Sequence, residues 1–119
     1  QDLGIDGKTH ADGLAVGRPS KLVGKMMDYV LGGVVTVDDY KLYDYMRFLN
    51  GTENINIEPS ACAAFEGFVK LENTIEGKEY IKSHNLENNM KNAIHLAWAT
   101  GGSLVPEETN RQFLATYLK

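Results

Sequence analysis

The run from His95 to Gly102, near the end of the chain, is the feature that most constrains the fold. An apolar stretch with a tryptophan ends here in the hydroxyl-bearing Thr100, which two glycines follow. This order predicts a buried strand that stops at Thr100 and turns tightly. Because glycine has no Cβ, the backbone at Gly101 could approach a ligand closely, and open α/β sheets bind ligands at the carboxyl ends of their strands. The run alone also fits a simple tight turn.

The rest of the chain predicts strands that alternate with helices. We expect strands at 34–37, 55–57 and 93–99, and helices at 22–31, 39–50, 59–64, 77–83 and from Pro106 to Leu118. Such alternation is typical of an α/β fold with a mostly parallel sheet flanked by helices. The polar stretch 72–92 is expected at the surface.

Helical spacing of apolar residues predicts which faces are buried. The first helix carries a wide apolar stripe that should lie on a core and that Gly32-Gly33 ends. Asp38 is placed to cap the second helix. The stripe comprises Leu22, Val23, Met26, Met27, Val30 and Leu31. The buried face expected for the second helix consists of Leu42, Met46 and Leu49, and that expected for the last helix consists of Phe113, Leu114, Tyr117 and Leu118. Core or interface packing is expected for Tyr29, Tyr40, Tyr43 and Tyr45.

Composition limits the partners. A chain of 119 residues with 43% apolar content predicts one domain with a core. The net charge of −4, without a basic block, argues against nucleic acid or an anionic membrane surface. No apolar run approaches the roughly 18 residues of a membrane span. The single Cys62 fits a buried hydrophobe in a protein of the reducing cytoplasm. His10, His84 and His95 lie too far apart for a metal motif, so no metal site is expected.

Three segments closely resemble the C-terminal part of the D-serine dehydratase family. They are 9–20 (THADGLAVGRPS), 57–61 (IEPSA) and 98–108 (WATGGSLVPEE). Members of that family are β-eliminating lyases that depend on pyridoxal phosphate (PLP) and have the tryptophan-synthase-β-like fold, called fold type II. The resemblance implies that residues 1–119 form the C-terminal part of the large PLP-binding domain. His10 departs from the small residue expected before Ala-Asp-Gly, and Ser103 stands where some relatives have a third glycine.

The same resemblance implies roles for four residues at the cofactor. Thr100 would face the pyridine nitrogen, Gly13 would pack its backbone against one face of the ring, and Gly101 would let the backbone approach. Because a threonine hydroxyl is a very weak acid, it would donate a hydrogen bond to a neutral nitrogen. Glu58 would lie near the cofactor edge, where it either holds the loop, tunes charge or simply begins a helix. Asp12 would cap or brace its loop.

The resemblance also implies what this chain lacks. In the family, the lysine that forms the Schiff base and the glycine-rich phosphate loop both lie upstream of the matched region. The lysines here are Lys8, Lys21, Lys25, Lys41, Lys70, Lys78, Lys82, Lys91 and Lys119. None matches the family motif, and we expect all of them to be solvated surface charges. We therefore expect no catalytic residue in this segment, which would be an inactive fragment of a larger lyase.

The expected partners follow from this interpretation. They are the small-molecule substrate D-serine, the remainder of the large domain and the small domain; a monovalent cation often assists related enzymes. A fragment standing alone should expose an unpaired sheet edge and an apolar face, and so self-associate. Two alternatives stay open: a non-catalytic binding or interaction module derived from the fold, and a sibling serine or threonine dehydratase.

Overall fold

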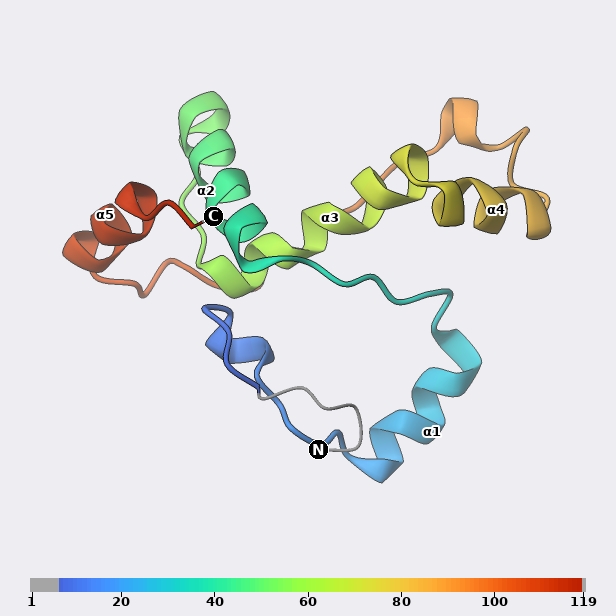
Figure 1. Cartoon of the computed structure of the whole chain (residues 1–119), viewed down its shortest axis with the longest axis horizontal. Coiled ribbons are helices and arrows are strands. Elements are labelled where there is room, and N and C mark those ends of the chain that lie inside the picture. Colours follow the sequence, from blue (N-terminus) through green and yellow to red (C-terminus); the bar gives the residue numbers. More distant parts are fainter. Residues whose placement is uncertain (1–6, 119) are drawn as a thin grey trace.

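A computed structural model of the chain describes residues 7–118. Figure 1 shows α2 beside α5, α3 crossing the middle of the molecule to α4, and α1 set apart below. The elements in order are the short 3-10 helix η1 (Asp12–Leu14), α1 (Lys21–Val30), α2 (Asp39–Glu53), α3 (Pro59–Asn73), α4 (Ile75–Ser83), the 3-10 helix η2 (Met90–Asn92) and α5 (Glu107–Ala115).

The core lies between α2 and α3. Leu42 and Met46, two residues of the predicted face of α2, are buried, and Leu49 is half-buried. They are joined by the buried Tyr43 and by Ala61 and Cys62 from the first turn of α3. The small side chains at the start of α3 let the two helices approach closely. The buried state predicted for Cys62 is confirmed.

Two helices, α2 and α3, end later than their sequence signals indicate, whereas α5 ends at Ala115, before the expected Leu118. The second helix passes Asn50-Gly51 and stops at Asn54, which adopts the left-handed conformation with φ of 55°. The third begins at Pro59 as predicted but continues to Asn73, because Phe65 and Glu66 pack on α2 and extend its buried face. In α3, burial of one face outweighs the weak local stop signal, whereas residues 51–53 at the end of α2 are exposed.

The predicted mostly parallel sheet is wrong, because residues 7–118 contain no strand. The segments expected to be strands are extended, but a strand also needs a neighbour to pair with its backbone. Residues 34–36 instead run along α3, where a Cβ on Gly67 would lie 3.9 Å from Val35. Residues 93–99 also run along α3, with His95 packed on Phe68 and Glu72. Both of these segments therefore pack on a helix, whereas Ile57, in the third expected strand, lies beside the Gly-Gly turn, and no ladder forms.

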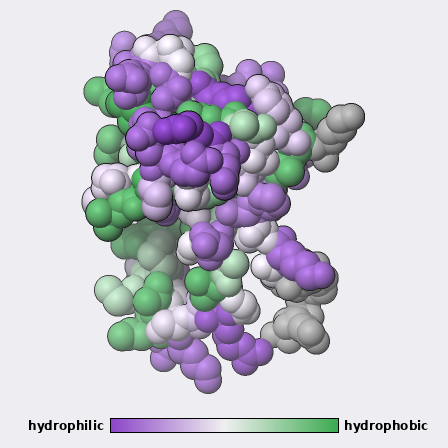
Figure 2. Space-filling view, turned by 90° about the vertical axis from the view of Figure 1, so that its left-hand side faces the viewer, coloured by the Kyte–Doolittle hydropathy of each residue, from purple (hydrophilic) through white to green (hydrophobic). Residues whose placement is uncertain are grey.

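The first helix also departs from expectation, since it lies on no core. None of the residues of α1 is buried, and Leu22, Met26 and Val30 are 68%, 62% and 74% exposed. The radius of gyration is 16.1 Å, against about 13.5 Å for a compact domain of this length. Figure 2 shows hydrophobic atoms at the surface in its lower part, which holds the N-terminal segment and α1.

The last helix packs inward as predicted, and it does so against α2, but not with every residue expected. Phe113, Leu114 and Leu118 are partly buried against the core. Tyr117 is 75% exposed and lies over the guanidinium of Arg47, 4.0 Å from it. Its ring therefore makes a cation–π contact at the surface in place of the predicted core packing.

Candidate functional site

Three segments far apart in the sequence meet at one corner of the molecule. The backbone N–H of Glu58 donates a hydrogen bond to the carbonyl of Gly101 at 3.2 Å. The N–H of Gly13 donates to Oγ of Ser60, also at 3.2 Å. The η1 loop, the start of α3 and the Gly-Gly turn therefore form one surface. We call it the three-loop corner and define it by residues 11–13, 58–61 and 100–102.

Both glycines lie very close to their neighbours, and at Gly102 the geometry requires glycine. A Cβ on Gly101 would lie 2.6 Å from Cδ of Glu58, so the carboxylate occupies the space that a side chain there would need. A Cβ on Gly102 would lie 2.4 Å from the backbone Cα of Ile57, and Gly102 has a φ of 128°. This close approach of two backbones admits glycine only.

The Ala-Asp-Gly loop is braced from within. The Asp12 carboxylate accepts a hydrogen bond from the N–H of Gly13 at 2.7 Å, which confirms the predicted bracing role. A Cβ on Gly13 would lie 3.1 Å from Oγ of Ser60 and 4.0 Å from Oε1 of Glu58. Gly13 thus brings its bare backbone up to the start of α3.

Glu58 lies at the centre of the corner. It is the N-cap residue of α3 and is half-buried, with no capping hydrogen bond from its side chain. The positive end of the helix dipole stabilises a carboxylate at this position. Glu58 therefore begins α3, and its carboxylate lies beside Gly101. Thr100, which directly precedes Gly101, is an exposed residue.

Four residues anchor the η1 loop to α2. The Asp39 carboxylate accepts hydrogen bonds from Oγ1 of Thr9 at 2.6 Å and from the N–H of His10 at 2.7 Å. Nδ1 of His10 pairs with the hydroxyl of Tyr43 at 2.7 Å. Burial, with Asp39 nearby, raises the pKa of Tyr43. Sequence reasoning missed this anchor, and the only local signal for Asp39 is its place in the first turn of α2.

A second polar pair is buried between α2 and α3, away from the three-loop corner. The hydroxyl of Tyr45 donates a short hydrogen bond to the buried carboxylate of Glu66. The pKa of Tyr45 is raised, chiefly because the side chain is buried and secondly because of this hydrogen bond. Burial alone raises the pKa of the Cys62 thiol to about 12. Cys62 is therefore a protonated packing residue, as its sequence context predicts.

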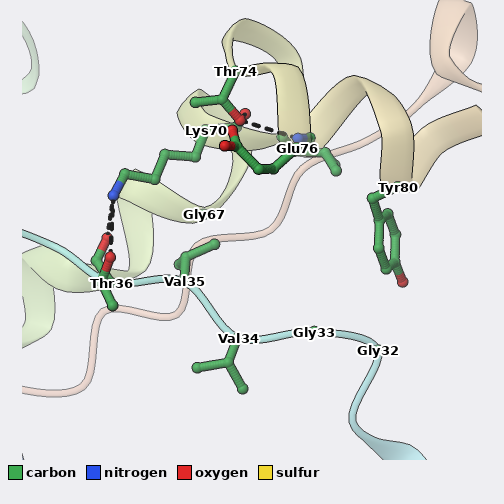
Figure 3. A pocket seen from close by; sticks show the side chains of 12 residues that line it. Gly32, Gly33, Val34, Val35, Thr36, Gly67, Lys70, Thr74, Glu76 and Tyr80 are labelled. Atoms are coloured by element: carbon green, nitrogen blue, oxygen red, sulfur yellow. Dashed lines mark hydrogen bonds between the residues drawn. The ribbon is translucent and has the colours of Figure 1, made fainter.

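A cavity of about 800 Å³ lies between residues 32–36 and the junction of α3 with α4. Figure 3 shows Val34 and Val35 on one side and Tyr80 on the other. Nζ of Lys70 donates to the carbonyl of Thr36 at 2.6 Å, so this lysine is not the solvated charge expected from the sequence. None of the predicted site residues lines the cavity.

The histidines occupy three separate environments. His84 stacks on Tyr80 with ring centroids 4.0 Å apart, and His95 contacts Glu72 at 3.1 Å. Within residues 7–118, no group of three histidine, cysteine or acidic side chains could hold a metal ion. The helices of the described part of the chain are too short or too polar to cross a membrane.

Comparison with known proteins bears on the identity of this chain. No protein-family profile matches it. A "Probable D-serine dehydratase" of Fusobacterium nucleatum is 58% identical over 99% of this chain, and one of Geobacillus stearothermophilus is 52% identical over 91%. A "D-serine dehydratase" of Yersinia enterocolitica is 45% identical over 98%. The alignments cover 26%, 24% and 26% of these relatives, so the chain spans about a quarter of their length. The predicted resemblance is confirmed.

Proposed function

We propose that this chain, which matches the C-terminal part of D-serine dehydratases in sequence, contributes one wall of the cofactor pocket in a PLP-dependent lyase. The complete enzyme would convert D-serine to pyruvate and ammonia by β-elimination. The 119-residue chain alone would be inactive, because no lysine in it matches the family's catalytic lysine. The observation that carries the proposal is the meeting of the three family segments at one corner.

The residues of the three-loop corner fit a flat aromatic cofactor. Gly13 and Gly101 bring bare backbone to the corner, and a Cβ on Gly101 would collide with Glu58. Thr100, an exposed residue, directly precedes Gly101 at this surface. Neither glycine adds a side chain of its own to this surface, although the Glu58 carboxylate and Ser60 Oγ stand where the Cβ atoms of Gly101 and Gly13 would be. A carboxylate and a hydroxyl at its margin supply the few polar groups that orient a ligand.

The chemistry of these side chains limits what each can do. Bound PLP would supply the electron-withdrawing ring that β-elimination needs. Thr100 would keep its proton on Oγ1 and donate a hydrogen bond to the ring nitrogen, since its hydroxyl is too weak an acid to give the proton away. Glu58 would hold the Gly101 backbone in place and add negative charge at the edge of the pocket. Neither residue abstracts a proton from the substrate in this proposal.

The exposed apolar surfaces favour a missing partner made of further lyase sequence. The apolar stripe of α1 is uncovered, and Ile94, Leu96 and Trp98 are 95%, 88% and 77% exposed. Alternate residues of an extended segment point to the same side, so these three form a continuous apolar row. Large uncovered apolar patches mark interaction sites. The relatives are about four times as long as this chain, so the remaining polypeptide could cover both surfaces.

The experiment measures binding of PLP to the 119-residue chain. The chain is titrated with PLP while the backbone amide signals of Gly13 and Gly101 are followed by NMR. We expect these two signals to shift together. Thr100→Val keeps the shape but removes the hydroxyl, so the dissociation constant should rise about three- to tenfold, while Thr100→Ser should change it little.

Three outcomes contradict parts of the proposal. Shifts confined to the Tyr80 cavity would move the ligand site away from the three-loop corner. If Thr100→Val and Thr100→Ser changed the dissociation constant for PLP equally, the hydroxyl of Thr100 would have no role in binding. Pyruvate released from D-serine by the 119-residue chain alone would disprove its inactivity. In the complete enzyme, turnover of L-threonine in place of D-serine would identify a sibling dehydratase.

A further inference from the structure

The loop that carries Gly13 is held in place by α2, an element outside the family segments. One carboxylate, that of Asp39, accepts two hydrogen bonds from consecutive loop residues, at 2.6 Å from Thr9 Oγ1 and 2.7 Å from the N–H of His10. Asp39 is in the first turn of α2, where the helix dipole favours its negative charge. Hydrogen bonds to an ionised acceptor are stronger than those between neutral groups.

The Asp39 contact reaches Gly13 through a short chain of hydrogen bonds. Thr9 Oγ1, held by Asp39, accepts a hydrogen bond from the N–H of Ala11 at 3.1 Å. The carbonyl of Ala11 in turn accepts from the N–H of Leu14 at 2.8 Å, which closes the turn around Gly13. Ala11 is 3% exposed, so it is also fixed by packing. The position of Asp39 therefore determines where the turn begins.

We propose that Asp39 is the positioning residue of the cofactor-facing loop, and that it acts on Gly13 through Thr9 and Ala11. Asp39 touches neither the three-loop corner's glycines nor the expected ligand directly. It sets the register in which the Gly13 N–H meets Ser60 Oγ at 3.2 Å. The anchoring itself follows from the contacts above, whereas its effect on the cofactor rests on the proposed function.

Hydrogen exchange of single amides tests the anchoring. In the full chain, Asp39→Asn removes the charge and one acceptor oxygen, and we expect the amides of His10 and Ala11 to exchange about tenfold faster or more. Asp38→Asn is the matched control. It makes the same charge change one residue earlier, at an exposed residue whose side chain makes no capping hydrogen bond, and it should leave both amides unchanged.

A second pair of variants keeps the test informative if Asp39→Asn disturbs α2. Thr9→Val removes the hydroxyl with little change of shape, and it should speed exchange at Ala11 while Thr9→Ser restores protection. Combined with Asp39→Asn, Thr9→Val should add little at Ala11, because both substitutions break the same hydrogen-bonded chain. Equal exchange at Ala11 in Asp39→Asn, Asp38→Asn and the unmodified chain would overturn the proposal. Additive effects of the two substitutions would overturn the relay through Thr9.

Titration with PLP separates this inference from the proposed function. If both hold, Asp39→Asn should lower the PLP-induced shift of the Gly13 amide and raise the dissociation constant severalfold, while Asp38→Asn does neither. Faster exchange at Ala11 with unchanged PLP affinity would support the anchoring role and contradict the loop's role in cofactor binding. Unchanged exchange together with weaker affinity would overturn the anchoring role and leave the cofactor site intact.

Discussion

Replacement of Gly102 by alanine should strongly destabilise the fold. The added Cβ would lie 2.4 Å from the Cα of Ile57 and 2.8 Å from the backbone nitrogen of Glu58. These neighbours are backbone atoms, so no rotamer change can relieve the overlap. Gly102 also has a φ of 128°, a conformation that side chains rarely adopt.

The magnitude follows from two separate costs. A residue held in a disfavoured backbone conformation costs about 1–3 kcal/mol, and overpacking costs another 1–3 kcal/mol or so. We therefore expect a loss of about 3 kcal/mol or more for Gly102→Ala. With a urea dependence of about 2 kcal/mol per M, the unfolding midpoint should fall by about 1.5 M.

Far-UV circular dichroism is the suitable assay, because the described residues are mainly helical. Fluorescence of Trp98 would report poorly, since the residue is already exposed in the folded chain. Gly51→Ala is the matched control. Gly51 lies in α2 and a Cβ there meets nothing within 4 Å, so alanine should stabilise the chain by about 0.5–1 kcal/mol.

The two glycine substitutions should thus move the midpoint in opposite directions. A Gly102→Ala chain with an unchanged midpoint would refute the packing of the Gly-Gly turn against Ile57. It would also argue against the three-loop corner, because the hydrogen bond between Glu58 and Gly101 depends on the same close approach of the Gly-Gly turn to Ile57. A lower midpoint for Gly51→Ala would instead show that the general cost of adding a Cβ had been misjudged.

Three further predictions concern the buried interface of α2 and α3. Cys62 should resist iodoacetamide in the folded chain and react once the chain is unfolded in urea, because its thiol is buried with a pKa of about 12. Mass spectrometry measures the labelling, and rapid labelling of the folded chain would contradict this prediction. Tyr45→Phe should cost about 1–3 kcal/mol in urea unfolding, since it removes the hydrogen bond to the buried carboxylate of Glu66; an unchanged midpoint would show that this carboxylate finds another partner. The third prediction is alkaline destabilisation. The folded pKa of Cys62 is raised from an ordinary 9.0 to about 12, so its contribution is complete below pH 9 and is lost as the pH rises toward 12, at about 1.4 kcal/mol per unit. The raised pKa of Tyr43 and of Tyr45 adds to this loss above pH 10, and midpoints that stay level from pH 8 to 11 would refute it.

Much of the helical structure could be predicted from local pattern. The apolar spacing at Leu42, Met46 and Leu49 places α2 and its buried face, and Pro59 marks the start of α3. The ends were less predictable, since α3 runs nine residues past the expected Ala64 to Asn73. Local signals compete there with burial against α2, which depends on contacts between residues distant in the sequence.

The candidate site was predictable as a set of segments but not as an arrangement. Gly13, Glu58 and Gly101 were each singled out by motif, and the structure brings them together. Ser60 lies within one of the motifs, but the motif assigns it no role, and only the structure shows that its Oγ accepts a hydrogen bond from the N–H of Gly13. Asp39 carries no motif at all, because its importance arises only from where the η1 loop returns to α2.

By itself, the sequence determined the relationship to D-serine dehydratases, the helices with strong apolar periodicity and the glycines of the Gly-Gly turn. Only the tertiary structure decided that residues 34–36 and 93–99 lie along α3, that α1 stands uncovered, and which side chains meet Gly13. The physical reason is the range of the interactions. Helix periodicity and glycine conformation are properties of a few neighbouring residues. An extended segment becomes a strand, or a stripe becomes buried, only when a distant partner lies beside it.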